Sequence, residues 1–205
     1  MSAPVSERRA MFVKDLYTLQ GRLESRNTAL RSASRRTLAG LRRGLAAGQA
    51  GLGTHEIVFR HDPPDPELDA WLLVAGLFAT HPNAGRGRGS LGTAMHALRE
   101  KRGGATPREK GDDAVTRRFE QLLLRDRAGL PHHLRQVVRL LASDGVPVNY
   151  GVLLDDLVIL LGGDYRGESA HRVRLRWARD FHTGPRTAPA TAAAAGRPSA
   201  TATTE

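Results

Sequence analysis

Apolar residues between positions 117 and 141 recur at intervals of three and four, a spacing that predicts two amphipathic helices in tandem. At about 100° per residue, Phe119, Leu122 and Leu123 fall on the same side of the first helix as Val115. The core face of the second helix holds Leu134, Val137, Val138 and Leu141. Each helix therefore has one face suited to a hydrophobic core.

Basic residues flank both of these apolar faces. Arg118 and Arg125 run beside the core residues of the first helix, and His132, Arg135 and Arg139 run beside those of the second. Arg135 and Arg139 are like charges one turn apart, an arrangement that costs an isolated helix about 0.2–0.5 kcal/mol. We interpret these stripes as the binding face for a polyanion, such as a phosphate backbone, that offsets the cost.

The same periodicity predicts further helices along the chain. Their expected starts are Ser6 or Glu7, Ser25, Asp65 or Pro66, Leu91, Val152 and His171, and Asp112 is the expected N-cap of the first tandem helix. The segment 25–47 is predicted as one helix, or as two with a break near Ser32–Ser34. Residues 67–80 are apolar all round, which is typical of a buried helix, so we expect this helix at the centre of the core.

Glycine and proline mark the connections between these helices. Residues 48–66 are predicted to be irregular, with Ile57–Phe59 as a short extended piece. The loop 81–92 contains glycine and arginine, but it lacks the preceding strand and the following Lys-Ser/Thr of a phosphate-binding P-loop. Gly145 is expected to end the second tandem helix.

The whole pattern predicts an all-α fold with about eight helices in one compact domain, residues 1–182. Residues 183–205, rich in alanine, threonine and proline, are predicted to be a disordered tail.

The charge balance of the chain favours a polyanionic partner. Its 31 Lys+Arg residues exceed its 21 Asp+Glu residues and give a formal net charge of +10, nearly all from arginine. A genome rich in arginine codons would give a similar composition without any binding function. The segment 25–47 is more specific, because Arg42 and Arg43 share it with other arginines and no acid. Arg172 and Arg176 form a further stripe, in which Glu168 and Asp180 have the spacing to neutralise part of the charge.

Composition also narrows the cellular setting. The chain has no cysteine, which excludes disulfides, cysteine-ligated metal sites and a cysteine nucleophile. The first twelve residues lack the apolar region of a signal peptide, and the longest uncharged apolar run, 70–80, is too short to span a bilayer. We therefore expect a cytoplasmic protein that contacts no membrane.

No arrangement of residues predicts catalysis, a metal site or a cofactor. His132 and His133 are neighbours rather than an i,i+4 pair, and no HExxH or GxSxG motif occurs. Asp155 and Asp156 point about 100° apart on a helix, so we expect one to be exposed and the other to pair with an arginine. A metal-dependent nuclease would need acids from several elements to converge. We predict that the protein is not an enzyme.

Several segments resemble the small subunit of the type I-E CRISPR surveillance complex Cascade, the CasB family. The most specific block is RRFEQLL followed by LRQVVRLL. The others are LRRGL at 41–45, LLVAGLFATHP, GSLGTAMHAL and RVRLRWARDF, in family order over residues 10 to 182. The chain departs from the family pattern at Leu160, where a tryptophan is common, and in the long 48–62 connection.

The resemblance implies an all-helical, non-catalytic subunit whose partners are the other Cascade subunits, crRNA, target DNA and a second copy of itself. It further implies that basic surfaces hold the DNA in an R-loop, particularly its displaced strand. Motif matching nominates Arg42, Arg43, Arg117, Arg118 and Arg135 as nucleic-acid-binding residues, and stripe counting adds Arg125 and Arg139, with Arg172 and Arg176 as further candidates. Leu124 lies on the far side of its helix from Phe119, which fits either burial by a partner subunit or an ordinary exposed leucine. The alternative functions are a free-standing helical regulator that binds nucleic acid and a metal-dependent nuclease.

Overall fold

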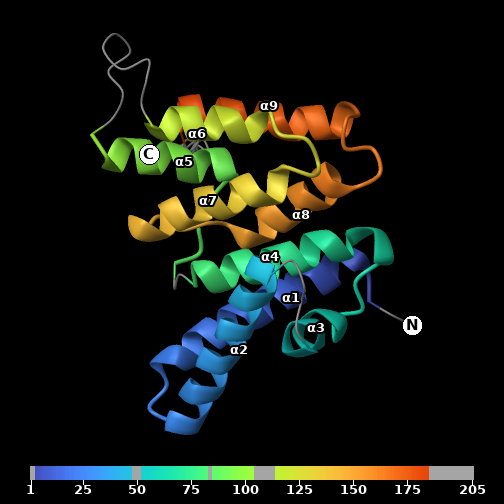
Figure 1. The fold of residues 1–205 in the computed structure, drawn as a ribbon, viewed down its shortest axis with the longest axis vertical. Helices are drawn as coiled ribbons and strands as arrows, with labels where there is room; N and C mark the ends of the chain where they lie inside the picture. The colour runs from blue at the N-terminus through green and yellow to red at the C-terminus, as the bar shows by residue number, and fades with distance from the viewer. Residues whose placement is uncertain (1–2, 48–51, 83–84, 104–113, 185–205) are drawn as a thin grey trace, which may run out of the picture.

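The computed structural model describes residues 3–47, 52–82, 85–103 and 114–184, which form nine α-helices and no strand (Figure 1). The helices are α1 (Val5–Gly21), α2 (Thr28–Ala47), α3 (Leu52–Phe59), α4 (Leu68–Thr80), α5 (Leu91–Lys101), α6 (Ala114–Leu123), α7 (Leu130–Ser143), α8 (Tyr150–Leu161) and α9 (Glu168–Thr183). Two 3₁₀ turns, η1 (Arg22–Glu24) and η2 (Asp65–Glu67), precede α2 and α4. The predicted all-α class is confirmed.

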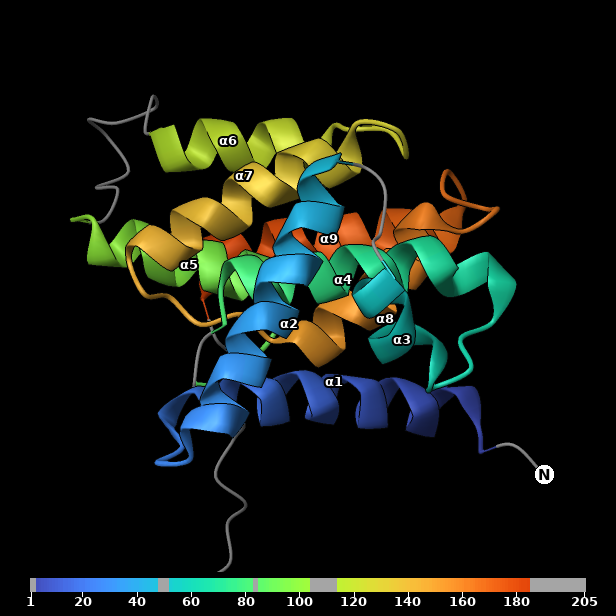
Figure 2. The same cartoon turned by 60° about the horizontal axis from the view of Figure 1, so that its bottom comes forward.

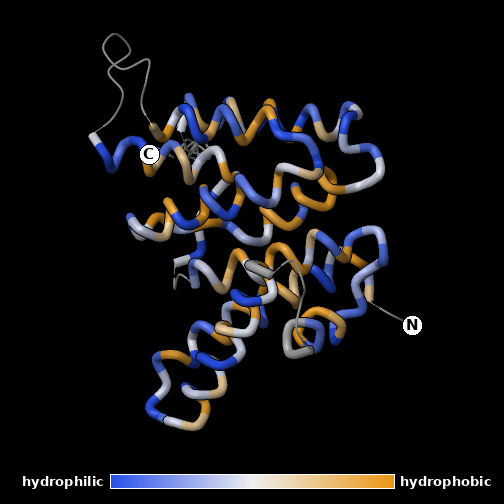
Figure 3. Tube along the Cα trace, viewed as in Figure 1, coloured by the Kyte–Doolittle hydropathy of each residue, from blue (hydrophilic) through white to orange (hydrophobic). Residues whose placement is uncertain are grey.

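Helix α4 is the centre of the core, as its sequence predicts. Nine of its residues are buried, and α2, α3, α7 and α8 all pack against it. Apolar residues are concentrated along α4 and α8 in Figure 3. Phe12 of α1 packs on Trp71 of α4 with ring centroids 4.8 Å apart. A helix buried on every side needs apolar residues all round, because unpaired polar side chains would lose their hydration there.

A polar network fastens α1 to this core. Arg9 of α1 donates two hydrogen bonds to Glu67, of 2.9 and 2.5 Å, and a third of 2.9 Å to Asp155 of α8. The indole of Trp71 also donates to Glu67, at 3.1 Å. Burial tends to raise the pKa of Glu67, but the hydrogen bonds from Arg9 and Trp71 leave it lowered overall. Asp155 is 60% exposed, as expected for one member of the Asp155–Asp156 pair.

A second group of helices, α5, α6 and α9, lies on the opposite side of α7 and α8 from α2 and α3 (Figure 1). Phe119 of α6 and Phe181 of α9 meet in this group, with ring centroids 4.6 Å apart. Helix α5 crosses α9 so closely that a Cβ added to Gly92 would lie 2.0 Å from the Trp177 carbonyl oxygen. This crossing brings α5 and α9 together at a distance only glycine permits.

The tandem pair predicted from residues 117–141 is confirmed as α6 and α7. Val115, Phe119 and Leu122 are buried on α6, and every predicted core residue of α7 is buried. Helix α7 ends in a Schellman turn, with Gly145 at φ 64° donating to Ala142 and Val146 donating to Leu141. Asn149 then caps α8 by accepting a hydrogen bond from the Val152 amide.

The structure contradicts one sequence-based prediction and decides between two alternatives that the sequence left open. The predicted extended piece Ile57–Phe59 is wrong, because these residues form the last turn of α3, where Ile57 and Val58 are buried. Residues 28–47 form one continuous helix without a break near Ser32–Ser34. The Asp112 cap and the tail from residue 185 lie outside the described residues. None of the described helices is both long and apolar enough to cross a membrane.

Candidate nucleic-acid interface

A groove with a volume of about 590 Å³ opens where the C-terminal end of α2 meets the start of α7. Figure 2 shows α2 lying across the molecule with this end beside α7. Gly44 and Leu45 of α2, Leu72 and Leu73 of α4, and Arg135 of α7 line the groove. The segment that joins α6 to α7 and the end of α8 complete the lining. The fold thus brings together four segments that are distant in sequence.

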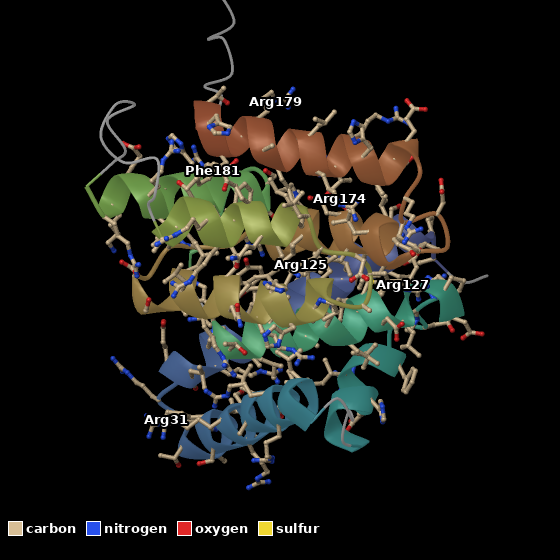
Figure 4. The ribbon with its side chains drawn as sticks, turned by 45° about the horizontal axis from the view of Figure 1, so that its top comes forward. Arg31, Arg125, Arg127, Arg174, Arg179 and Phe181 are labelled. Carbon is tan, nitrogen blue, oxygen red and sulfur yellow. The ribbon has the colours of Figure 1, made fainter. Side chains whose placement is uncertain are left out.

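Six of the predicted arginines lie on the helices α2, α6 and α7, and Arg125 lies just after the end of α6, not on the helix as its stripe predicted. We call these seven residues the arginine surface: Arg42, Arg43, Arg117, Arg118, Arg125, Arg135 and Arg139. All seven are exposed except Arg135, which is half-buried. Arg42 and Arg43 immediately precede the two groove residues of α2. In Figure 4, Arg125 lies between Arg31, toward α2, and Arg174 and Arg179, toward α9. Arginine side chains from several helices are therefore visible on this side of the molecule.

Most of the arginine surface makes no ion pair with another residue that the structure describes. Within the described ranges, Arg42, Arg43, Arg118 and Arg139 have neither a salt bridge nor a side-chain hydrogen bond. Arg125 donates only to the Gln121 carbonyl, at 3.2 Å. Charges held without a counterion are costly to accumulate on one surface, and a polyanion that binds them lowers that cost.

His133 of α7 lies close to Arg125 of the arginine surface and to His132. Its pKa is lowered from 6.5 by partial burial and then by the nearby charges of Arg125 and His132. Burial is the larger cause, and the like charges of Arg125 and His132 disfavour the imidazolium form further. The sequence contains no signal that marks His133 as a binding residue, because its contact with Arg125 depends on how α7 is oriented against the end of α6.

We predict that Arg125→Ala raises the pKa of His133, because it removes one of the two neighbouring positive charges. The pKa of His133 should also rise when single-stranded DNA binds, since phosphates stabilise the imidazolium, and binding should tighten as pH falls through the titration of His133. Two-dimensional NMR titration of the histidine ring protons measures both shifts. A His133 pKa that moves with neither change would show that the local potential is not positive.

The arginines of α9 have different environments from one another. Arg172 pairs with Glu168 at 3.6 Å, as predicted, and both side chains are well exposed. The expected pair of Arg176 with Asp180 is wrong, because Arg176 bonds instead to Asp156 of α8. The indole of Trp177 donates to the other oxygen of Asp156 at 2.7 Å. Packing of α8 against α9 brings this buried carboxylate to Arg176, and sequence spacing alone cannot reveal such a contact.

Asp156 confirms the expectation that one aspartate of its pair would be held by an arginine. It is 2% exposed, and burial raises its pKa although Arg176 and Trp177 stabilise the charged form. Asp180 in turn accepts a hydrogen bond from the Ser90 hydroxyl at 2.7 Å and lies 3.5 Å from Arg179. In the described ranges, no group of three or more His, Asp or Glu side chains is placed to hold a metal ion.

Arg176→Ala is expected to lower the free energy of unfolding by about 1–3 kcal/mol at neutral pH, because it leaves a buried carboxylate without its ion pair. Arg172→Ala, whose pair is exposed, should cost less than about 0.5 kcal/mol. The cost of Arg176→Ala should shrink as pH falls below the folded-state pKa of Asp156, since the protonated acid needs no counterion. Urea denaturation of both variants at neutral and acidic pH measures this, and equal costs for the two would contradict it.

Another cation at the groove was not predicted as a binding residue. Arg127, in the segment between α6 and α7, lines the groove and pairs with Asp69 of α4 at 3.6 Å. Figure 4 shows it beside the N-terminal end of α4. The sequence contains no signal for this contact, because Arg127 lies outside the helical stripes and its partner is 58 positions away.

Comparison with known families identifies the chain. The family model of CRISPR-associated protein Cse2 matches residues 37–182. The chain belongs to this family. This confirms the resemblance that the sequence blocks indicated. No curated protein matches the chain at a significant level.

Solved structures of Cse2-family proteins share the fold. CasB from Thermobifida fusca is 26% identical with a TM-score of 0.63, and the match covers 89% of this chain and 99% of that one. CasB from M. ruber is 27% identical with a TM-score of 0.58, over 85% of this chain and 92% of that one. A chain of a CRISPR RNA-guided surveillance complex, 23% identical with a TM-score of 0.63 over 87% of this chain and 93% of that one, also has this fold.

Proposed function

We propose that this Cse2-family protein is a non-catalytic subunit of an RNA-guided surveillance complex and that it holds target DNA open in the R-loop. Its arginine surface contacts the backbone of the displaced strand. The partners in this proposal are the other subunits, crRNA, target DNA and a second copy of the chain, in the cytoplasm. Family membership and the fold shared with a surveillance-complex chain support the assembly part of the proposal.

The observation that carries the DNA-binding part is the arginine surface itself. Arg42 and Arg43 on α2 are exposed and have no acidic partner in the described parts of the chain. One guanidinium group can donate hydrogen bonds to two phosphate oxygens at once, and each phosphate contact releases condensed counterions. Such contacts recognise a backbone and not a base sequence, as a complex that binds many targets requires.

Weak contacts are enough to favour the R-loop, because the free energy of R-loop formation is close to zero. The RNA–DNA duplex that forms is about as stable as the DNA duplex that it replaces. A few kcal/mol from backbone contacts to the displaced strand therefore shift the equilibrium substantially. No chemical step is required of the protein for this role.

Complexes assembled with and without the subunit test the proposal. R-loop occupancy can be followed by permanganate reactivity of thymines in the displaced strand. Omitting the subunit should lower occupancy at physiological salt while crRNA loading of the other subunits is retained. Equal occupancy in both preparations would contradict the proposal.

The alternative function is a free-standing regulator, and a binding measurement on the purified chain distinguishes it from the proposed function. The purified chain alone should bind single-stranded DNA weakly, without sequence preference and with strong salt dependence. A regulator would instead bind one short duplex sequence much more tightly than others. Competition binding with scrambled duplexes distinguishes the two behaviours.

A further inference from the structure

The groove between α2 and α7 has a lining that the arginine surface does not explain. Its floor is apolar and is formed by Leu72 and Leu73 of α4 and by Leu161 at the end of α8. Its volume, about 590 Å³, lies within the ~300–1,000 Å³ range typical of sites for small organic groups. Leu73 and Leu161 also belong to the hydrophobic core, but phosphates gain nothing from the apolar surface that they present to the groove.

The polar groups of the groove include both donors and acceptors. The Nε of Arg135 is buried and has no hydrogen-bond partner among the described residues, although buried donors are normally satisfied. Arg127 and Asp69 face each other at 3.6 Å, which is longer than a good hydrogen bond. Asp126 accepts from the Gly129 amide at 2.8 Å with one oxygen, which fixes its carboxylate at the groove.

We infer that this groove accepts one unstacked nucleobase of the single strand whose phosphates lie on the arginine surface. The inference rests on the proposed function and adds a second mode of contact to it. An apolar floor suits the face of a base, and the mixture of arginine donors and carboxylate acceptors suits its polar edge. A phosphate fits poorly, because Asp69 and Asp126 would repel it.

The position of the groove supports this occupant. Arg42 and Arg43 directly precede Gly44 and Leu45, which line the groove from α2, and Arg135 lines it from α7. A strand held by phosphate contacts on α2 therefore passes the opening of the groove. The chain has few aromatic residues, 5% of the total, so the apolar floor is the natural place for a base to leave water.

The groove can be narrowed without changing any charge and without adding an aromatic ring on which a base could stack. Ala128 lines it and is exposed, so Ala128→Leu places an isobutyl group in the groove without disturbing the core. Ala33→Leu is the matched control, because Ala33 is exposed on α2 and is not among the groove residues. Thermal melts of both variants verify that the fold is retained.

The test compares two oligonucleotides of equal length and charge, one carrying bases and one made entirely of abasic tetrahydrofuran residues. Fluorescence anisotropy at low salt with the full chain measures both affinities. We expect the wild-type protein to bind the base-bearing strand about fivefold to tenfold more tightly. Ala128→Leu should reduce this preference and leave abasic binding unchanged, whereas Ala33→Leu should keep the preference.

The possible failures are distinguishable. Equal wild-type affinities for the two strands, both lowered by Arg42→Ala/Arg43→Ala, would overturn the base site and leave the proposed backbone binding intact. No binding of either strand would overturn both. If Ala128→Leu keeps the base preference but prevents assembly of the surveillance complex, the groove receives a protein segment and the inference is wrong.

Discussion

Replacing Arg42 and Arg43 together by alanine is expected to weaken the hold of the assembled complex on the displaced strand about tenfold at physiological salt. Each phosphate contact to a single strand contributes about 0.7 to the slope of log K against log salt. The two contacts together therefore raise the affinity about tenfold when the salt concentration falls from about 1 M to about 0.15 M, and the variant loses this gain. R-loop occupancy at limiting complex concentration measures the loss. Both side chains are exposed, and the fold should be unaffected within about 0.5 kcal/mol.

The matched control for this pair is Arg42→Lys/Arg43→Lys. Lysine retains the positive charge, and most of the counterion release with it, so affinity should fall much less than in the alanine variant. Arg172→Ala is a second control, because Arg172 has an acidic partner at 3.6 Å on its own helix. Occupancy of the Arg42→Ala/Arg43→Ala complex equal to that of the wild type would show that the arginines of α2 do not contact DNA.

Gly92→Ala is expected to destabilise the protein by at least about 3 kcal/mol, a large effect for the addition of one methyl group. The new Cβ would lie 2.0 Å from the Trp177 carbonyl oxygen and 2.8 Å from its carbon, both backbone atoms of α9. Backbone in a helix cannot rotate away, so α5 and α9 must separate and lose packing around Trp177. Urea denaturation measures the change as a lower midpoint at an unchanged slope.

The same substitution at Gly40 is expected to raise the free energy of unfolding. Gly40 lies within α2, and nothing approaches its added Cβ within 4 Å, so alanine should stabilise the helix by about 0.5–1 kcal/mol. If Gly92→Ala and Gly40→Ala changed stability alike, the close crossing of α5 and α9 would be incorrect.

The helices that could be predicted from the sequence are those whose local pattern agrees with their environment. Helix α4 is apolar all round and buried all round, and α6 and α7 bury the faces that their periodicity selects. Helix α3 was missed because its β-branched Ile57 and Val58 favour extended structure, whereas burial against the core decides their conformation.

The candidate site was predictable in part for the same reason. Helical phase identifies Arg118 and Arg139 as exposed, since it depends on one helix only. The partner of Arg176 and the pair of Arg127 with Asp69 depend on contacts between segments distant in sequence, which periodicity does not contain. The groove itself is built from four segments, so no local pattern could reveal it.

The most direct test of the central claim is the salt dependence of DNA binding by the assembled complex. The slope of log K against log salt should fall by about 0.7 for each arginine removed, and by about 2.8 for the combined alanine variant of Arg42, Arg43, Arg118 and Arg139. This slope counts phosphate contacts independently of the absolute affinity. A decrease of that size is the result that the account predicts. An unchanged slope in the fourfold variant would show that the arginine surface does not bind the DNA backbone.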